Sequence, residues 1–107
     1  MKTRTMLIAA PLALFASQAI AENWVTVPDD ELTMVDKDSI RRGSDGLVYF
    51  LDDTGKKAAL AVECNKGLIY LLKDEEGDYP SWRDHGEAVE AGGSEDAELK
   101  YACGNVP

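Results

Sequence analysis

Short runs of hydrophobic residues, separated by turn-forming residues, predict a series of β-strands in the first two thirds of the chain. Five runs have strand length and are rich in β-branched and aromatic side chains. They are residues 23–27, 32–36, 47–51, 58–64 and 68–72. Gly- and Asp-rich tetrapeptides follow the second run and the third, and such sequences are typical of tight turns and hairpins. The pattern predicts about five antiparallel strands, of which the last three form a meander.

A helix is predicted at the C-terminus, from Ser94 onward. Serine is a favoured capping residue, and Glu95 and Asp96 place negative charge in the first turn, where the helix dipole favours it. Hydrophobic positions at helical spacing follow, and they would lay the helix on the sheet. These positions are Leu99, Ala102 and Cys103. The predicted fold class is therefore α+β, a small antiparallel sheet with a C-terminal helix, and the alternative is a terminal strand.

Residues 73–93 show no hydrophobic period and are acidic and rich in turn formers. A loop of this length is unusual in a small domain and is either functional or partly mobile. Tyr79 and Trp82 flank Pro80 within it, and aromatic side chains often dominate binding interfaces. They are a candidate ligand-facing pair. The alternative is that their rings cover the core.

The first 21 residues have the three-part layout of a secretory signal peptide. Lys2 and Arg4 precede a hydrophobic run, and small residues end at Ala21, so cleavage is expected between Ala21 and Glu22. A membrane anchor would need roughly 20 apolar residues, about twice this run. No cysteine stands near the cleavage point to accept a lipid. We expect an exported protein, periplasmic or secreted, that is not a lipoprotein and does not insert into a membrane after cleavage, with one domain over residues 22–107.

Charge narrows the possible partners. The 107 residues carry a formal net charge of −9, from 11 basic and 20 acidic side chains. Loss of residues 1–21 removes Lys2 and Arg4 and no carboxylate, which leaves 9 basic and 20 acidic side chains and a charge of −11. Nucleic acid is excluded as a partner, because a chain without basic excess cannot replace phosphate counterions.

The two cysteines, Cys64 and Cys103, predict a disulfide. In an exported chain an even number of cysteines indicates pairing, and a cross-link suits a domain with a thin core. Free thiols or an intermolecular bridge are the alternatives.

No residue pattern predicts catalysis, a cofactor or a metal site. The segment 36–41 begins like a calcium loop but has Ile40 and Arg41 where a ligand and a glycine belong. The acidic run 74–78 would hold a cation weakly at best. His85 has no partner suggested by the sequence and is expected in a surface loop. A non-enzymatic protein without cofactor is predicted.

The order of several landmarks resembles the surface-adhesin protein E-like family of small exported bacterial proteins. They are Trp24, the phrase over residues 35–43, Cys64, Trp82, and the closing Gly93-Ser94 and Tyr101-Ala102-Cys103. The resemblance covers nearly all of residues 22–107. It implies an antiparallel sheet and a C-terminal helix tied by a disulfide.

The resemblance also implies a binding function, because the namesake adhesin binds host matrix and serum proteins. That adhesin is anchored through a lipid, and this sequence lacks the acceptor cysteine. The leading hypothesis is an exported, adhesin-like binding module for a host matrix or envelope protein. The alternative is a periplasmic accessory or structural protein with an acidic face for a basic partner or for weak cation binding.

Overall fold

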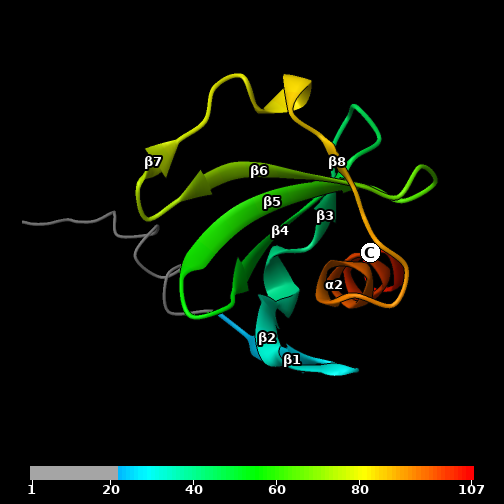
Figure 1. Cartoon of the computed structure of the whole chain (residues 1–107). Coiled ribbons are helices and arrows are strands. Elements are labelled where there is room, and N and C mark those ends of the chain that lie inside the picture. Colours follow the sequence, from blue (N-terminus) through cyan, green and yellow to red (C-terminus); the bar gives the residue numbers. More distant parts are fainter. Residues whose placement is uncertain (1–21) are drawn as a thin grey trace, which may run out of the picture.

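A curved antiparallel sheet and one α-helix make up the part of the chain that the structure describes (Figure 1). The structure is a computed structural model and describes residues 22–107. The predicted signal segment, residues 1–21 ending at Ala21, lies outside the described residues. The predicted α+β class with a C-terminal helix is confirmed.

The sheet has eight strands, three more than predicted. The strands are β1 (Trp24–Val27), β2 (Asp30–Asp36), β3 (Arg41–Arg42), β4 (Val48–Asp53), β5 (Lys57–Glu63), β6 (Leu68–Asp74), β7 (Gly77–Asp78) and β8 (Glu87–Ala88). Their spatial order is β1-β2-β4-β5-β6-β7, with β3 paired to β4 and β8 paired to β6. The helices are α2 (Ser94–Gly104) and the 3₁₀ turns η1 (Lys37–Ser39) and η2 (Trp82–Asp84).

The five predicted strands correspond to the five long strands, and the predicted meander is β4-β5-β6. The three additional strands, β3, β7 and β8, contain two residues each. They form edge pairings without a hydrophobic pattern of their own, so periodicity could not reveal them. Two of them lie within residues 73–93, which the sequence predicted to be unstructured.

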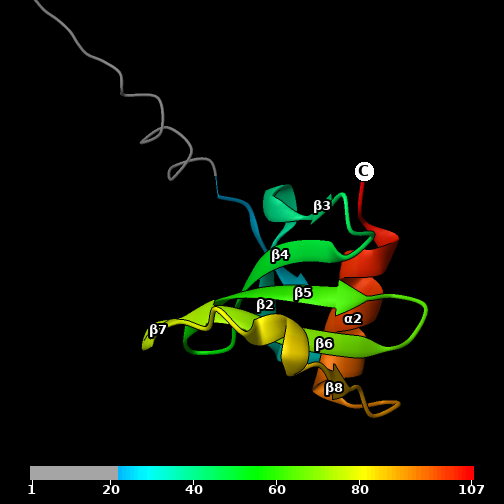
Figure 2. The ribbon, with the colours of Figure 1, turned by 90° about the horizontal axis from the view of Figure 1, so that it is seen from above.

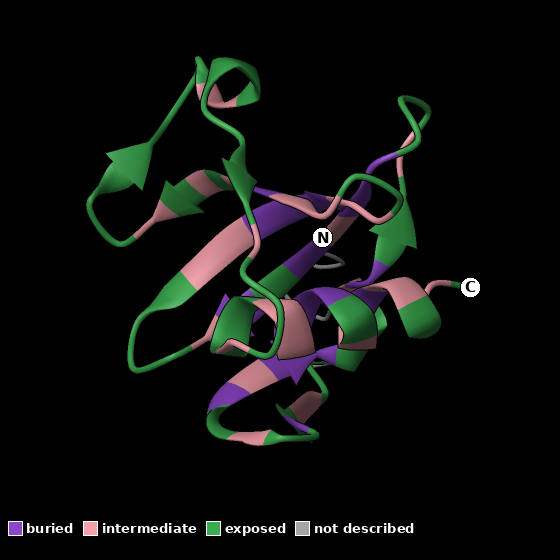
Figure 3. Cartoon of the chain, turned by 45° about the vertical axis from the view of Figure 1, so that its right-hand side comes forward, coloured by how far each residue is buried: buried purple, intermediate pink, exposed green. Residues whose placement is uncertain are grey.

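One face of the sheet carries the helix. In the register of the meander, Val48 pairs with Val62 and Phe50 with Leu60, so these side chains share the face toward α2. Figure 2 shows the helix crossing the strands steeply on this side. The buried residues concentrate in the sheet centre and on the facing side of the helix (Figure 3). The core consists of Val27, Val35, Ile40, Val48, Phe50, Leu60, Val62, Ile69, Leu99 and Ala102.

A disulfide ties the C-terminal end of α2 to the sheet. Cys64, just after β5, is bonded to Cys103, and their Cα atoms are 6.0 Å apart. The predicted pairing is confirmed, and neither cysteine is free. The predicted helical stripe is also present, with Leu99 and Ala102 buried. It includes one residue that the sequence analysis did not single out, the buried Glu98.

The start of α2 differs from the prediction. Ser94 was expected to cap the helix, but the N-cap is Gly93 and no side chain caps it there. Asp96 instead reaches back and accepts a hydrogen bond of 2.9 Å from the backbone N–H of Gly92. Lys100 pairs with the same carboxylate at 3.0 Å. Together these two contacts lower the pKa of Asp96, the backbone hydrogen bond being the larger cause.

Reduction of the disulfide is expected to lower the melting temperature of the purified protein by more than about 10 °C. The bridge closes a loop of about 40 residues, which in the chain-entropy model stabilises by roughly 4 kcal/mol, and in a domain of this size each kcal/mol shifts the midpoint by about 4–8 °C. Thermal unfolding with and without reductant, followed by circular dichroism, measures the effect. The Cys64→Ser/Cys103→Ser variant is the control and should not respond to reductant. An unchanged midpoint for the native protein would contradict the pairing.

Candidate functional site

Residues 79–86, which we call the strap, cross the face of the sheet opposite the helix. Trp82 anchors the strap, because its ring is half-buried and makes edge contacts with Tyr49 of β4 and Tyr70 of β6. The centroid distances are 6.1 and 5.5 Å. The structure therefore places Trp82 on the sheet, where it holds the acidic loop against the domain.

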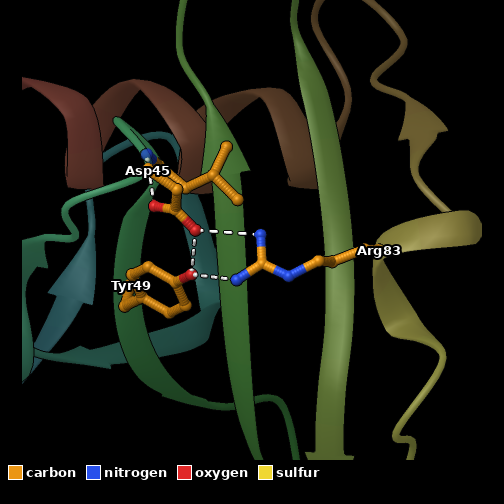
Figure 4. A network of polar contacts seen from close by, with 4 residues as sticks. Asp45, Tyr49 and Arg83 are labelled. Carbon is orange, nitrogen blue, oxygen red and sulfur yellow. Dashed lines mark hydrogen bonds and ion pairs between the residues drawn. The ribbon is translucent and has the colours of Figure 1, made fainter.

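Arg83 extends the contact between strap and sheet (Figure 4). Its guanidinium pairs with the Asp45 carboxylate at 3.0 Å and donates to the Tyr49 hydroxyl at 3.5 Å. The Tyr49 hydroxyl in turn donates to Asp45 at 2.5 Å. This last bond is the main cause that lowers the pKa of Asp45, with Arg83 a smaller one. All three groups are thus engaged with one another, and the network fastens the strap to the sheet.

Tyr79, the other candidate ligand-facing residue, lies at the outer end of the strap. Its side chain is 37% exposed, and its hydroxyl donates to the Asp74 carboxylate at 3.0–3.1 Å. Asp74 also accepts from the backbone N–H of Glu76 at 2.9 Å. The structure does not bring Tyr79 and Trp82 into one pocket, and their role as a ligand-facing pair stays a prediction.

The segment 36–41 does not form a cation loop. Asp36 caps the turn η1 by accepting from the backbone N–H of Asp38 at 3.2 Å, and it also accepts from the N–H of Asn23 at 3.0 Å. Ser39 accepts from the N–H of Leu51 at 2.9 Å and joins this turn to β4. Within residues 22–107, no group of three or more potential metal-ligating side chains comes together.

The candidate functional site is a cavity of about 540 Å³ on the helix side of the sheet, which we call the acid cavity. Its apolar floor belongs to β5 and β6, and its polar wall belongs to the N-terminal half of α2 and the end of β4. The floor residues are Ala58, Leu60, Ile69 and Leu71, and the polar residues are Asp52, Thr54, Lys56, Asp74, His85, Glu87, Ser94, Glu95 and Glu98. His85, which the sequence placed in a surface loop, is exposed and lies at the cavity rim.

Two buried carboxyl groups lie at the centre of this wall. Asp52 of β4 is 5% exposed and Glu98 of α2 is 4% exposed. Each of the two carboxyl groups perturbs the pKa of the other, so they lie within reach of each other. The Oε2 atom of Glu98 is buried and has no hydrogen-bond partner. Each buried polar atom of this kind costs roughly 1–3 kcal/mol.

Burial and neighbouring charge keep this pair protonated. Desolvation is the largest cause that raises the pKa of Glu98 to about 10, followed by the hydrogen bond and charge of Asp52. The carboxylates of Glu95 and Asp30 add to it. Burial also raises the pKa of Asp52, against the opposing effect of its hydrogen bond to Glu98. At neutral pH Glu98 therefore keeps its proton.

Sequence analysis missed this pair, although its signal was present. In β4 the inward positions are Val48, Phe50 and Asp52, so the period of two points the aspartate toward the core. In α2 the position four residues before Ala102 on the helix stripe is Glu98. In both β4 and α2, the sequence thus showed a carboxylate at the spacing of a buried hydrophobic stripe. The sequence did not show that these two side chains meet in the fold.

A second, smaller cavity lies on the strap side of the sheet. It measures about 310 Å³, and Trp24, Leu51 and Lys57 contribute to its lining. The Lys57 ammonium lies 5.5 Å from the centre of the Trp24 ring. It contains no unpartnered buried polar atom, so the acid cavity is the stronger candidate.

Comparisons with protein-family models, with curated proteins and with solved structures find no match for this chain. Within the described residues, no helix has the length and hydrophobicity needed to cross a bilayer.

Replacing Glu98 with glutamine is expected to stabilise the protein at neutral and alkaline pH. The pKa of Glu98 rises from 4.5 to about 10 on folding, so between these values only the folded state holds the proton. The stability that this proton contributes is fully present below pH 4.5. Above that pH, the free energy of unfolding falls as pH rises, by up to about 1.4 kcal/mol per pH unit. Melting temperatures measured from pH 5 to 9 should fall less steeply for Glu98→Gln and lie higher at pH 8, by about 4 °C or more.

The control for this measurement is Glu31→Gln, which removes an exposed carboxylate outside the cavity and should follow the native curve. The pKa values of Asp30, Asp45 and Asp96 are lowered, and these groups do not change the melting temperature between pH 5 and 9. Groups with depressed pKa lose their stabilisation only as pH falls toward and below about 4. A native-like curve for Glu98→Gln between pH 5 and 9 would contradict the buried pair.

The strap is expected to depend on Gly86. A Cβ atom at this position would lie 2.5 Å from Cε2 of the Tyr70 ring, so Gly86→Ala forces the strap or the ring to move, at a cost of about 1–3 kcal/mol. A lower melting temperature and a change in Trp82 fluorescence should accompany it. Gly104→Ala is the matched control, because nothing lies within 4 Å of its Cβ. Equal stability of the two variants would show that the strap does not pack on Tyr70.

Proposed function

We propose that this protein is a non-enzymatic, exported, adhesin-like binding module, and that the acid cavity is its ligand site. The observation that carries the proposal is the unpartnered Oε2 atom of Glu98, buried beside a cavity of about 540 Å³. This volume is within the range of small-ligand sites, roughly 300–1,000 Å³. Such sites combine an apolar lining with a few polar groups that orient the ligand, as this cavity does.

The free energy of the carboxyl pair favours a binding role. Native proteins leave few buried polar atoms without partners, because each one loses its hydration without compensation. Where such an atom lines a cavity, a ligand that donates a hydrogen bond recovers that loss. A hydrogen-bond donor that reaches the pair therefore gains more binding free energy than it would at an exposed carboxylate.

The same pair is poorly arranged for the reaction most often performed by two carboxyl groups. Glycoside hydrolysis needs them about 5–9.5 Å apart, with sugar or water between them, whereas Asp52 and Glu98 are close enough for each to perturb the pKa of the other through a hydrogen bond. This closeness supports binding rather than catalysis.

Two further features support an exported binding module. The Cys64–Cys103 disulfide suits an oxidising compartment. The resemblance of the landmarks around Trp24, Cys64 and Trp82 to the surface-adhesin protein E-like family suggests a protein partner, either a host matrix or an envelope protein. A side chain of that partner would occupy the cavity.

A second candidate function is a periplasmic accessory protein that holds a basic partner by charge alone. It is favoured by the cavity rim, where the carboxylates Asp74, Glu87 and Glu95 accompany the buried pair. Salt separates the two functions, because exposed charges are screened over about 10 Å at 0.1 M ionic strength and 3 Å at 1 M. Binding inside the cavity would persist at high salt, and binding by the rim would not.

Titration with four-carbon probes of different chemistry tests the proposed function. The probes are n-butylamine, butyrate, 1-butanol and butyltrimethylammonium, followed by ¹⁵N NMR of the purified protein. At least one should give saturable shifts at residues that line the acid cavity. Leu71→Trp, which fills the cavity from its floor, should abolish the binding.

Leu51→Trp is the matched control for this titration. Both leucines are partly exposed, 41% for Leu71 and 38% for Leu51, but Leu51 lines the second cavity on the opposite face. This variant should bind like the native protein. Absence of saturable binding by every probe, or loss of binding in Leu51→Trp alone, would overturn the assignment of the acid cavity.

A further inference from the structure

We propose that the acid cavity recognises a primary alkylammonium group, with the alkyl chain on the apolar floor and the ammonium against Asp52 and Glu98. This inference rests on the proposed function and names the ligand class of the same site. The chemistry is shared by a lysine side chain of a protein partner and by a free alkylamine.

The charge around the cavity selects a cation. Five carboxyl groups line it, against one lysine and one histidine; the acidic residues are Asp52, Asp74, Glu87, Glu95 and Glu98. The charge of Asp30, in strand β2, also raises the pKa of Glu98. An anionic ligand would meet the carboxylates of Asp74, Glu87 and Glu95, which outnumber the single lysine, Lys56.

The floor selects a linear aliphatic chain. Ala58, Leu60, Ile69 and Leu71 form it, and no Phe, Tyr or Trp side chain is among the lining residues. Quaternary ammonium groups are usually bound in cages of aromatic rings, which attract the cation by their faces. The cavity lacks such faces, so it is suited to an unbranched methylene chain.

The unpartnered acceptor selects a hydrogen-bond donor. An ammonium group has three N–H donors and no acceptor, and it can donate to the carboxyl groups of Asp52 and Glu98, which both line the cavity. Glu98 holds a proton in the ligand-free protein. When the ammonium binds against it, that proton leaves to the buffer and the Glu98 carboxylate becomes charged. The ammonium keeps its own protons, so one proton is released for each ligand bound.

The comparison of probes tests this selection. At pH 7.5, n-butylamine should shift the cavity resonances with a dissociation constant at least tenfold lower than those of butyrate, 1-butanol and butyltrimethylammonium. Nα-acetyl-lysine N-methylamide forms a second arm. Tighter binding of this lysine derivative than of n-butylamine identifies a protein side chain as the source, and weaker binding identifies a free amine; both results support the ammonium site.

Two glutamate-to-glutamine variants test the residues. Glu98→Gln keeps the shape of the side chain but cannot release a proton to form a carboxylate, and it should weaken n-butylamine binding at least tenfold. Glu31→Gln makes the same substitution at an exposed position outside the cavity and should change the binding less than twofold. Equal weakening by both variants would show that n-butylamine responds only to the net charge, and would overturn the inference.

Proton release gives an independent readout. Titration calorimetry in phosphate and in Tris, whose ionisation enthalpies differ, should show release of up to one proton with n-butylamine, and none in Glu98→Gln. Failure of the inference is distinguishable from failure of the proposed function. If butyrate or 1-butanol binds and Leu71→Trp blocks it, while n-butylamine does not bind, the cavity is a binding site but not for ammonium. If none of the probes binds, both the inference and the proposed function are wrong.

Discussion

The attachment of α2 to the sheet is the contact on which the rest of this structure depends. Few residues of the helix are buried, and among its fully buried residues Leu99 is the one large hydrophobic side chain. Burial of one leucine stabilises by about 1.5–3 kcal/mol, and an isolated helix of this length is marginal in water. The disulfide from Cys103 to Cys64 supplies the missing constraint, and it does so at the C-terminal end of the helix. The N-terminal end has no cross-link, and there Ser94, Glu95 and Glu98 line the acid cavity.

The strap covers the opposite face of the sheet, as α2 covers the first. Its attachment depends chiefly on the two edge contacts of Trp82, since aromatic pairs contribute about 0.5–1.5 kcal/mol each beyond the area they bury. The ion pair of Arg83 with Asp45 is exposed on the arginine side, and such pairs contribute little. The strap leads directly into β8, so its position on the sheet also sets where His85 and Glu87 stand at the cavity rim. The two faces of the sheet are thereby connected.

Local sequence patterns were sufficient for most of the fold and insufficient for the site. The hydrophobic runs located the five long strands, because half-buried strands require such side chains at strand spacing. Residues 73–93 were predicted as a loop, since β7 and β8 owe their existence to pairing with the edge of β6 and not to their own side chains. Asp52 and Glu98 each lay in phase with a buried stripe, but their meeting depends on how α2 crosses β4. No local pattern encodes that crossing.

The contrast between two buried carboxylates separates a structural from a functional role. Asp36 is 5% exposed and accepts from the backbone N–H groups of Asn23 and Asp38, so its burial is compensated within the fold. Glu98 is equally buried, yet its Oε2 atom has no hydrogen-bond partner, and burial beside Asp52 raises its pKa. Replacing buried charged groups by hydrophobic ones is often neutral or stabilising, and a domain this small has little stability to spare. Sequences depart from the most stable choice mainly at functional sites. The uncompensated burial of Glu98 beside an open cavity is therefore best explained by a ligand that supplies the missing donor.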